Sequence, residues 1–140
     1  MPIAKSRKVF VNLPVSDLPR AKAFFGKLGF SFNPQFTNDD AACMILSDEG
    51  YVMLLTHQHF SQFTKRAIAD QGSPTEVLVA LSCDSKEEVA ELVKLALESG
   101  GKAAMPPMDH GFMVGGSFYD PDGHHWEVLW MDPAAIQPQS

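Results

Sequence analysis

Glu127 is the residue with the clearest chemical potential in this chain. It lies in an apolar stretch near the C-terminus, directly after Trp126. A carboxylate is seldom buried among apolar side chains unless it is paired or used. Glu127 is therefore expected to be a ligand, a general acid or base, or one half of a hydrogen-bonded pair with a neighbouring His or hydroxyl. His125 shares a strand face with Glu127 by its two-residue spacing, so the two could transfer protons.

His110 is a second catalytic candidate. It follows Asp109 and precedes Gly111, a residue that allows close approach of a ligand. The same stretch also fits a surface turn after two prolines, and both interpretations stay open. If the chain uses a divalent metal, a site could be built from the imidazoles and the carboxylate of this region, which are those of His110, His124, His125 and Glu127.

The remaining metal-ligating residue types give weaker signals. His57 and His59 have ligand-like spacing but no third ligand nearby, so they are interpreted as a loop pair. Cys43 and Cys83 lie in apolar runs without a metal-type spacing. They are expected to be buried free thiols in a reducing cytosol, which predicts a cytoplasmic location.

The elements that position these residues follow from apolar periodicity and turn residues. Asp17 can cap a helix that Gly29 ends, and Ser85 with Glu88 makes a capping box before a second helix. Asp84 is also interpreted as a cap, equivalent to Asp17. A less regular helix is predicted for residues 57–70. The predicted strands span residues 8–15, 30–36, 41–46, 51–56, 76–83, 102–104, 111–119 and 124–130.

This order is an internal duplication of a βαβββ unit and predicts an α+β fold. We expect one domain over residues 8–132, with modules of about 8–56 and 75–131 joined by a helical segment 57–73, and a tail at 133–140. Alignment of the modules on Gly50 and Gly123 makes Leu54 the equivalent of Glu127. Alternation then predicts two sets of side chains on the sheet face away from the helices: Val52, Leu54 and Thr56 in the first module; His125, Glu127 and Leu129 in the second.

Charge and composition narrow the possible partners. The chain has 17 acidic and 11 basic residues, a net charge of −6 that argues against binding to nucleic acid or an anionic membrane surface. No apolar stretch is long enough to span a membrane or to form a secretory signal. Ten Phe and seven Met predict an adaptable apolar interior, which could be either a packed core or a ligand cavity.

Several of these motifs resemble one family. The stretch Val11-Asn12-Leu13-Pro14-Val15-Ser16-Asp17-Leu18, then Phe24-Phe25, Leu28-Gly29-Phe30 and Asp120-Pro121-Asp122-Gly123 with Trp126-Glu127, resemble the vicinal oxygen chelate superfamily. That group holds glyoxalases, bleomycin and fosfomycin resistance proteins and extradiol dioxygenases. The resemblance covers residues 8–132 and includes the subset described as predicted lactoylglutathione lyases. It implies paired βαβββ modules whose curved mixed sheets enclose a cavity holding a divalent metal.

The four metal-ligand positions of the family can be carried over by the resemblance. The last ligand, a Glu, falls on Glu127, and the other three fall on Phe10, Leu54 and Leu78. Phenyl and isobutyl groups offer no lone pair, so a single carboxylate remains. Metal-dependent isomerisation of a glutathione thiohemiacetal at the usual site is therefore not expected, and no cofactor is predicted unless a displaced site exists.

Three functions follow as hypotheses. The preferred one is a cytoplasmic homodimer that binds a small apolar or amphipathic molecule, with ligand contacts from Phe10, Asn12, Leu54, Thr56, Leu78, Ser82 and Glu127. The second is a glyoxalase-like lyase or isomerase that uses Glu127 as acid and base, with His110 and His125, or a displaced metal. The third is a structural or partner-binding module that dimerises through Ala134-Ala135-Ile136-Gln137-Pro138.

Overall fold

The fold was analysed in a computed structural model that describes residues 6–135. The chain divides between Asp70 and Gln71 into two compact units, unit 1 and unit 2. Each unit contains one sheet with both parallel and antiparallel strand pairs and one long helix. The predicted α+β fold class is therefore confirmed.

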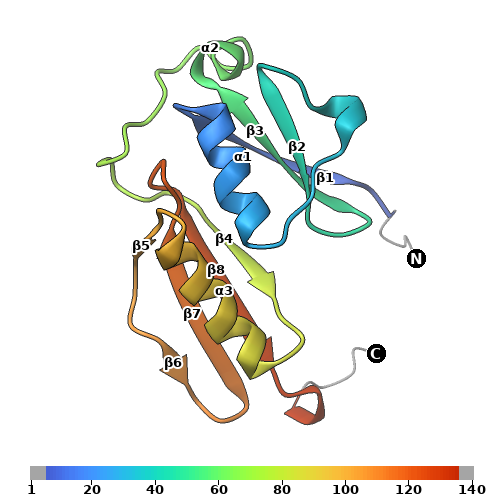
Figure 1. The fold of residues 1–140 in the computed structure, drawn as a ribbon, viewed down its shortest axis with the longest axis vertical. Helices are drawn as coiled ribbons and strands as arrows, with labels where there is room; N and C mark the ends of the chain where they lie inside the picture. The colour runs from blue at the N-terminus through green and yellow to red at the C-terminus, as the bar shows by residue number, and fades with distance from the viewer. Residues whose placement is uncertain (1–5, 136–140) are drawn as a thin grey trace, which may run out of the picture. The chain divides into compact units, whose positions relative to one another are not determined.

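Unit 1 is built on a three-stranded sheet in the order β1-β3-β2 (Figure 1). β1 pairs in parallel with β3, and β2 pairs antiparallel with β3. A single bridge from Phe32 to Met44 extends the sheet beyond β2. The elements are β1 (Val9–Val15), α1 (Leu18–Lys27), η1 (Pro34–Phe36), β2 (Ala41–Ile45), β3 (Gly50–Thr56) and α2 (His57–Phe60).

α1 begins and ends where the sequence predicts. A side-chain oxygen of Asp17 accepts a hydrogen bond of 3.0 Å from the backbone N–H of Arg20, which satisfies one of the free donors of the first turn. Gly29 has a φ of +102° just after the helix, a conformation that glycine adopts without strain. Phe24 and Phe25 are fully buried and form an edge-to-face pair. Their burial holds α1 on its sheet.

Unit 2 repeats the same arrangement with additional short strands. Its sheet has the order β4-β8-β7-β5, with β6 also paired to β7 (Figure 1). As in unit 1, the first strand lies parallel beside the last one. The elements are β4 (Leu78–Ser82), α3 (Lys86–Glu98), β5 (Lys102–Ala103), β6 (Met108–Asp109), β7 (Met113–Tyr119), β8 (His125–Met131) and η2 (Pro133–Ala135).

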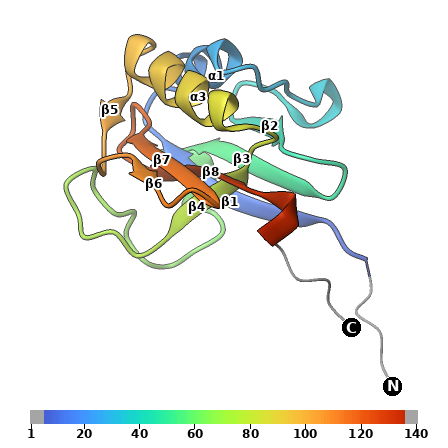
Figure 2. The same ribbon diagram turned by 90° about the horizontal axis from the view of Figure 1, so that it is seen from below.

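α3 covers one face of the unit 2 sheet (Figure 2). A Cβ placed on Gly116 of β7 would lie 2.7 Å from Val93 and 3.4 Å from Val89, both of α3, and 3.8 Å from Val128 of β8. The Lys86 ammonium also lies 5.3 Å from the ring centre of Trp130. These contacts confirm that Val128 and Trp130 point to the helix, so Glu127 and its alternate neighbours point to the opposite side. We call that side the face opposite α3.

Three predicted elements differ from the observed ones. The segment predicted as helix over 57–70, and as a helical connection over 57–73, is helical only in α2, which ends at Phe60. The predicted strand 30–36 is reduced to the Phe32 bridge, because Pro34 starts a short 3-10 helix instead. The two-residue strand β6 was not predicted, since it carries no periodicity of its own.

The cap of α3 is Ser85 and not Asp84. The Ser85 hydroxyl accepts from the backbone N–H of Glu88 at 3.1 Å. The Glu88 carboxylate returns a bond by accepting from the backbone N–H of Asp84 at 2.7 Å. The capping box is thus confirmed, and Asp84 contributes its backbone only.

Two further findings concern membrane-spanning helices and the C-terminal residues. No helix within residues 6–135 is long and apolar enough to cross a membrane. Residues 133–135 of the predicted tail form the short helix η2, and 136–140 lie outside the described residues, as do Ile136 to Pro138 of the proposed dimerisation segment.

Candidate functional site

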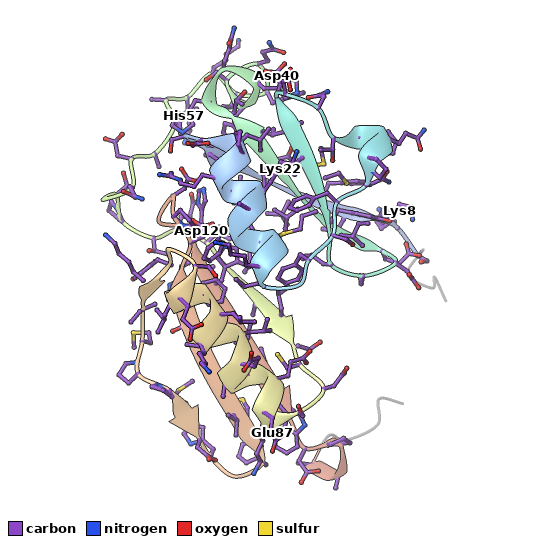
Figure 3. All side chains as sticks on the ribbon, in the orientation of Figure 1. Lys8, Lys22, Asp40, His57, Glu87 and Asp120 are labelled. Atoms are coloured by element: carbon purple, nitrogen blue, oxygen red, sulfur yellow. The ribbon has the colours of Figure 1, made fainter. Side chains whose placement is uncertain are left out.

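The buried carboxylate of unit 2 is Asp120, not Glu127. Asp120 is the first residue of the turn between β7 and β8, labelled in Figure 3. One carboxylate oxygen accepts from the backbone N–H groups of Asp122 (2.9 Å) and His124 (3.0 Å), and the other accepts from the indole N–H of Trp126 (3.0 Å). Burial raises the pKa of Asp120, while charge interaction with His124 and these hydrogen bonds oppose the rise. Asp120 is therefore a structural acceptor that fixes Trp126.

Glu127 is only partly buried and lies on the face opposite α3. Its neighbours across the sheet are Ala80 of β4 and Ser117 of β7. None of the hydrogen bonds within residues 6–135 involves the Glu127 carboxylate, so it is not one half of a hydrogen-bonded pair there. A carboxylate in this position is free to accept from a ligand.

His125 shares this face at the start of β8. It pairs with Leu78 and with Tyr119, whose ring centre lies 5.2 Å from that of the imidazole at 57°. The Nε2 atom of His125 is buried and has no hydrogen-bond partner among residues 6–135. Buried polar atoms usually have partners, so the unpartnered Nε2 atom of His125 is an exception in this part of the chain.

The β4 side of the face is open and mainly apolar. Leu78 keeps 42% of its surface exposed, and Ala80 and Ser82 are exposed as well. On the β7 side, the buried Ser117 hydroxyl accepts from the backbone N–H of Met105 at 2.9 Å and so holds the chain that follows β5. The face therefore combines exposed hydrocarbon with one unpartnered carboxylate.

In unit 1, the corresponding face carries Phe10 and Asn12. Phe10 stacks on Tyr51 with ring centres 4.9 Å apart and remains half exposed, and the Lys8 ammonium lies 5.5 Å from the Tyr51 ring centre (Figure 3 labels Lys8). The Asn12 side chain donates to the carbonyl of Phe10 at 3.2 Å. Both predicted residues therefore lie on a strand face accessible to a ligand.

Leu54 does not join them. It pairs with Leu13 in β1 and with Ala42 in β2, on the face opposite to Phe10 and Tyr51, and it is fully buried. The prediction that Leu54 lies on the sheet face away from the helix, as Glu127 does, is therefore wrong. It is also wrong for Val52 and Thr56, which share the face of Leu54 by alternation along β3. The Thr56 hydroxyl instead accepts from the N–H of His59 at 3.3 Å and caps α2.

The error comes from aligning the two modules on their glycines. Gly123 has a φ of +83° in a turn, whereas Gly50 is already paired with Val9 in a strand. Alignment of the two modules on their helix caps instead makes Asn12 the equivalent of Ala80, since each lies five residues before its cap. Asn12 pairs with Met53, and Ala80 pairs with Glu127. Met53 is thus the true counterpart of Glu127.

The four positions carried over from the family do not fit a divalent metal. Glu127 is the one oxygen donor, since Phe10, Leu54 and Leu78 end in hydrocarbon and Leu54 faces the core. Within residues 6–135, no three side chains among His, Cys, Asp and Glu come together as a ligand group.

The displaced set of histidines is not brought together either. The β6–β7 hairpin that carries His110 adjoins the Met131 end of β8, and His125 is at the other end, about 20 Å away at ~3.4 Å per residue. The Asp109 carboxylate accepts a hydrogen bond from the N–H of Gly111 at 2.9 Å. This bond is typical of a turn and agrees with the interpretation of this stretch as a surface turn. His124 interacts with Asp120 instead.

The two cysteines are buried and unbridged, as predicted. Burial and the neighbouring Glu88 carboxylate raise the pKa of the Cys83 thiol to about 11, and burial also raises the pKa of Cys43. Neither thiol is a nucleophile at neutral pH.

Acidic charge dominates the C-terminal part of the chain. From residue 103 onward the sequence contains five Asp and Glu residues and no Lys or Arg. Within β7 and β8 the one Asp, Glu, Lys or Arg is Glu127, so the face that carries it is favourable to cations.

Comparison with known proteins agrees with this architecture. The sequence profile of the Glyoxalase/Bleomycin resistance protein/Dioxygenase superfamily matches residues 8–128. Similar solved structures include a hypothetical protein from S. aureus (29% identity, TM-score 0.75, covering 91% of this chain and 95% of that one). A glyoxalase-related enzyme from Fulvimarina pelagi (21%, 0.76, 90% and 88%) and a lactoylglutathione lyase from Agrobacterium tumefaciens (16%, 0.67, 96% and 100%) share the fold. No curated protein matches the sequence significantly. The chain belongs to the glyoxalase, bleomycin resistance protein and dioxygenase superfamily.

Proposed function

We propose that this protein binds a small amphipathic organic molecule, with its polar end at Glu127 and its apolar part along Leu78. The observation that carries the proposal is the exposed Leu78 side chain on the same face as an unpartnered Glu127 carboxylate. Exposed hydrocarbon beside a few placed polar groups is typical of small-molecule sites. The absence of Lys and Arg after residue 102 favours a cationic polar end, such as an ammonium group.

We also infer that the metal site of the family has been lost here. Hydrocarbon at Phe10 and Leu78 supports this inference, and so does Met53, whose soft thioether stands where the counterpart of Glu127 is expected. In this proposal Ser82, exposed on the same strand face as Leu78, contributes a further ligand contact, and the protein acts by binding without a resident divalent ion.

The test is a titration with n-alkylammonium ions from butyl to octyl, followed by calorimetry and by NMR shifts of the Leu78 methyl groups. Each CH₂ buried against Leu78 is worth about 0.8 kcal/mol, so affinity should rise about fourfold per carbon. Glu127→Gln should weaken every member of the series, and Leu78→Ala should flatten its dependence on chain length.

Matched controls lie on α3. Leu97 is 44% exposed, close to the exposure of Leu78, and Glu91 is an exposed carboxylate. Leu97→Ala and Glu91→Gln should leave binding unchanged. An affinity that ignores chain length, or that survives Glu127→Gln, would contradict the proposed site.

A lyase or isomerase activity is the second candidate. The observation that favours it is that the Glu127 carboxylate and the unpartnered imidazole Nε2 of His125 belong to the same face of β8, two residues apart, since a carboxylate and an imidazole are groups that can relay a proton. The assay is turnover of the methylglyoxal–glutathione thiohemiacetal with and without a chelator. Activity that persists with chelator and falls at least a hundredfold in Glu127→Gln would support it; activity unchanged in that variant would exclude Glu127 as the acid and base.

A further inference from the structure

Four soft or borderline donors lie close together at the end of unit 2 away from His125. Met113 of β7 pairs directly with Met131 of β8. On its other side, the hairpin from β6 sets His110 against Met113, since the N–H of His110 donates to the Met113 carbonyl at 2.9 Å. Cβ atoms of directly opposed residues are about 4.5–5.5 Å apart, so three donor side chains stand in a row across three adjacent chain segments.

Met108 completes the cluster. It pairs with Gly115, and its Cε lies 3.7 Å from the position that a Cβ of Gly115 would occupy. Because Gly115 has no side chain, Met108 can lie over the sheet next to Met113. By the alternation of β7, these side chains are on the face opposite α3, since Gly116 faces the helix.

Two of the three methionine side chains are exposed to solvent and the third, Met113, is half-buried. Met108 is 44% exposed and Met131 is 38% exposed, whereas Met44 in the core of unit 1 is fully buried. Met131 is four positions along β8 from Glu127, a distance of about 14 Å at ~3.4 Å per residue. The cluster is therefore distinct from the amphipathic site proposed above.

The chemistry of these donors selects a particular class of ion. Thioether sulfur is a soft ligand that prefers Cu(I), and imidazole also binds copper, whereas Mg²⁺ and Ca²⁺ require oxygen. Asp109 and Asp132 flank the cluster, and no Lys or Arg occurs after residue 102, so a cation is not repelled. Long unbranched side chains can close around an ion without movement of the strands.

We propose that Met108, His110, Met113 and Met131 bind one soft monovalent cation, Cu(I) or its analogue Ag(I). The site uses neither the family's metal-ligand positions nor Glu127.

The test uses the full chain labelled with ¹³C at the methionine methyl groups and titrated with silver nitrate in chloride-free buffer. The methyl signals of Met108, Met113 and Met131 should shift and saturate at one equivalent, while those of Met44 and Met105 stay in place. Zn²⁺ should leave all methionine methyl signals unmoved. Silver uptake that leaves the three signals unmoved, as binding to the cysteines would, overturns the proposal.

Variants make the test quantitative. Met113→Leu keeps the apolar volume and should weaken Ag(I) binding at least tenfold, and Met131→Leu should do the same if the first variant is poorly folded. Met105→Leu is the matched control, because Met105 is an exposed methionine about 13 Å along β7, next to Ser117. Equal affinity in Met113→Leu and Met131→Leu would also overturn the site.

Discussion

At the scale of single residues, the buried acid of this protein has a structural task. Asp120 accepts three hydrogen bonds, and one of them fixes the indole of Trp126, a fully buried side chain of the unit 2 core. The turn Asp120-Pro121-Asp122-Gly123 thus anchors β8 through Trp126, the second residue of that strand. Glu127, the next residue of β8, points to the opposite side of the strand and keeps its carboxylate for other partners.

Replacement of Asp120 by Asn should destabilise the protein by about 1–3 kcal/mol, because the amide NH₂ of Asn must face an N–H donor. The effect should also depend on pH. Burial raises the folded-state pKa of Asp120 above its ordinary value of 3.8, so the folded state takes up this proton first. The contribution of Asp120 is thus most favourable below pH 3.8 and declines as the pH rises through the folded-state pKa.

Urea unfolding of both proteins across this range checks the sign. The advantage of wild type over Asp120→Asn should grow as the pH falls from neutral toward 3.8. A difference that shrinks over the same range would show that the hydrogen bonds outweigh the desolvation of this carboxylate.

The sheet face of a side chain could be predicted where it depended on a single strand. The alternation of Trp126 and Val128 against Glu127 could be predicted because each side chain in a strand alternates sides regardless of what surrounds it. The relation between Leu54 and Glu127 could not, because it depends on where each strand starts after its turn. Gly50 lies inside a strand and Gly123 outside one, and the two look alike in sequence.

At the scale of elements, α3 fits its sheet through one glycine. Gly116→Ala would put a methyl group 2.7 Å from Val93, too close for a carbon contact, so α3 or β7 must shift. We expect a loss of about 1–3 kcal/mol in unfolding free energy. Gly115→Ala is the matched control, since its methyl would meet Met108 at an ordinary 3.7 Å. Equal losses in the two variants would contradict this account of the helix contact.

The start of α3 gives a second element-level prediction. Ser85→Ala should cost about 1 kcal/mol, because the N–H of Glu88 loses its acceptor. Asp84→Ala should cost clearly less, since Asp84 takes part through its backbone N–H. Thermal unfolding of the two variants distinguishes them. A larger loss of stability in Asp84→Ala than in Ser85→Ala would show that Asp84, and not Ser85, caps α3.

Elements with their own signals were predictable, and those formed by context were not. α1 and α3 have caps and apolar faces, and both occur close to the predicted positions. The residues after Phe60 are good helix formers, yet nothing there packs a helical face strongly enough to outweigh the entropy of ordering it. β6 exists because β7 offers free backbone groups to pair with.

At the scale of the whole molecule, the connection between the units is a long exposed segment without regular structure. Residues 61–77 contain no helix or strand and are mostly exposed, and they include Lys65 and Arg66. Limited trypsin digestion should therefore cut first after these two residues and give two fragments of similar size. Lys65→Gln with Arg66→Gln should abolish this early cut. First cleavage at Arg20 or Lys27 in α1 would contradict the expected order of local stability.

The fold and the family could be read from the sequence at this scale because the duplicated pattern and the Asp-Pro-Asp-Gly motif extend over most of the chain. The predicted cavity and dimer depend on contacts that no sequence pattern specifies, and they stay predictions. The ligand chemistry rests on a few side chains, Leu78 and Glu127 above all.

The parallel pairing of first and last strands has a consequence for synthesis of the chain. β1 can pair only after β3 has been made, and β4 only after β8, because roughly 40 residues or more separate the partners in the sequence. Neither sheet can therefore be completed by a local hairpin alone. On the ribosome, unit 1 can complete its sheet while unit 2 is still being made. Unit 2 stays incomplete until the last strand emerges, so a premature stop before β8 would leave β4 as an unpaired, aggregation-prone edge.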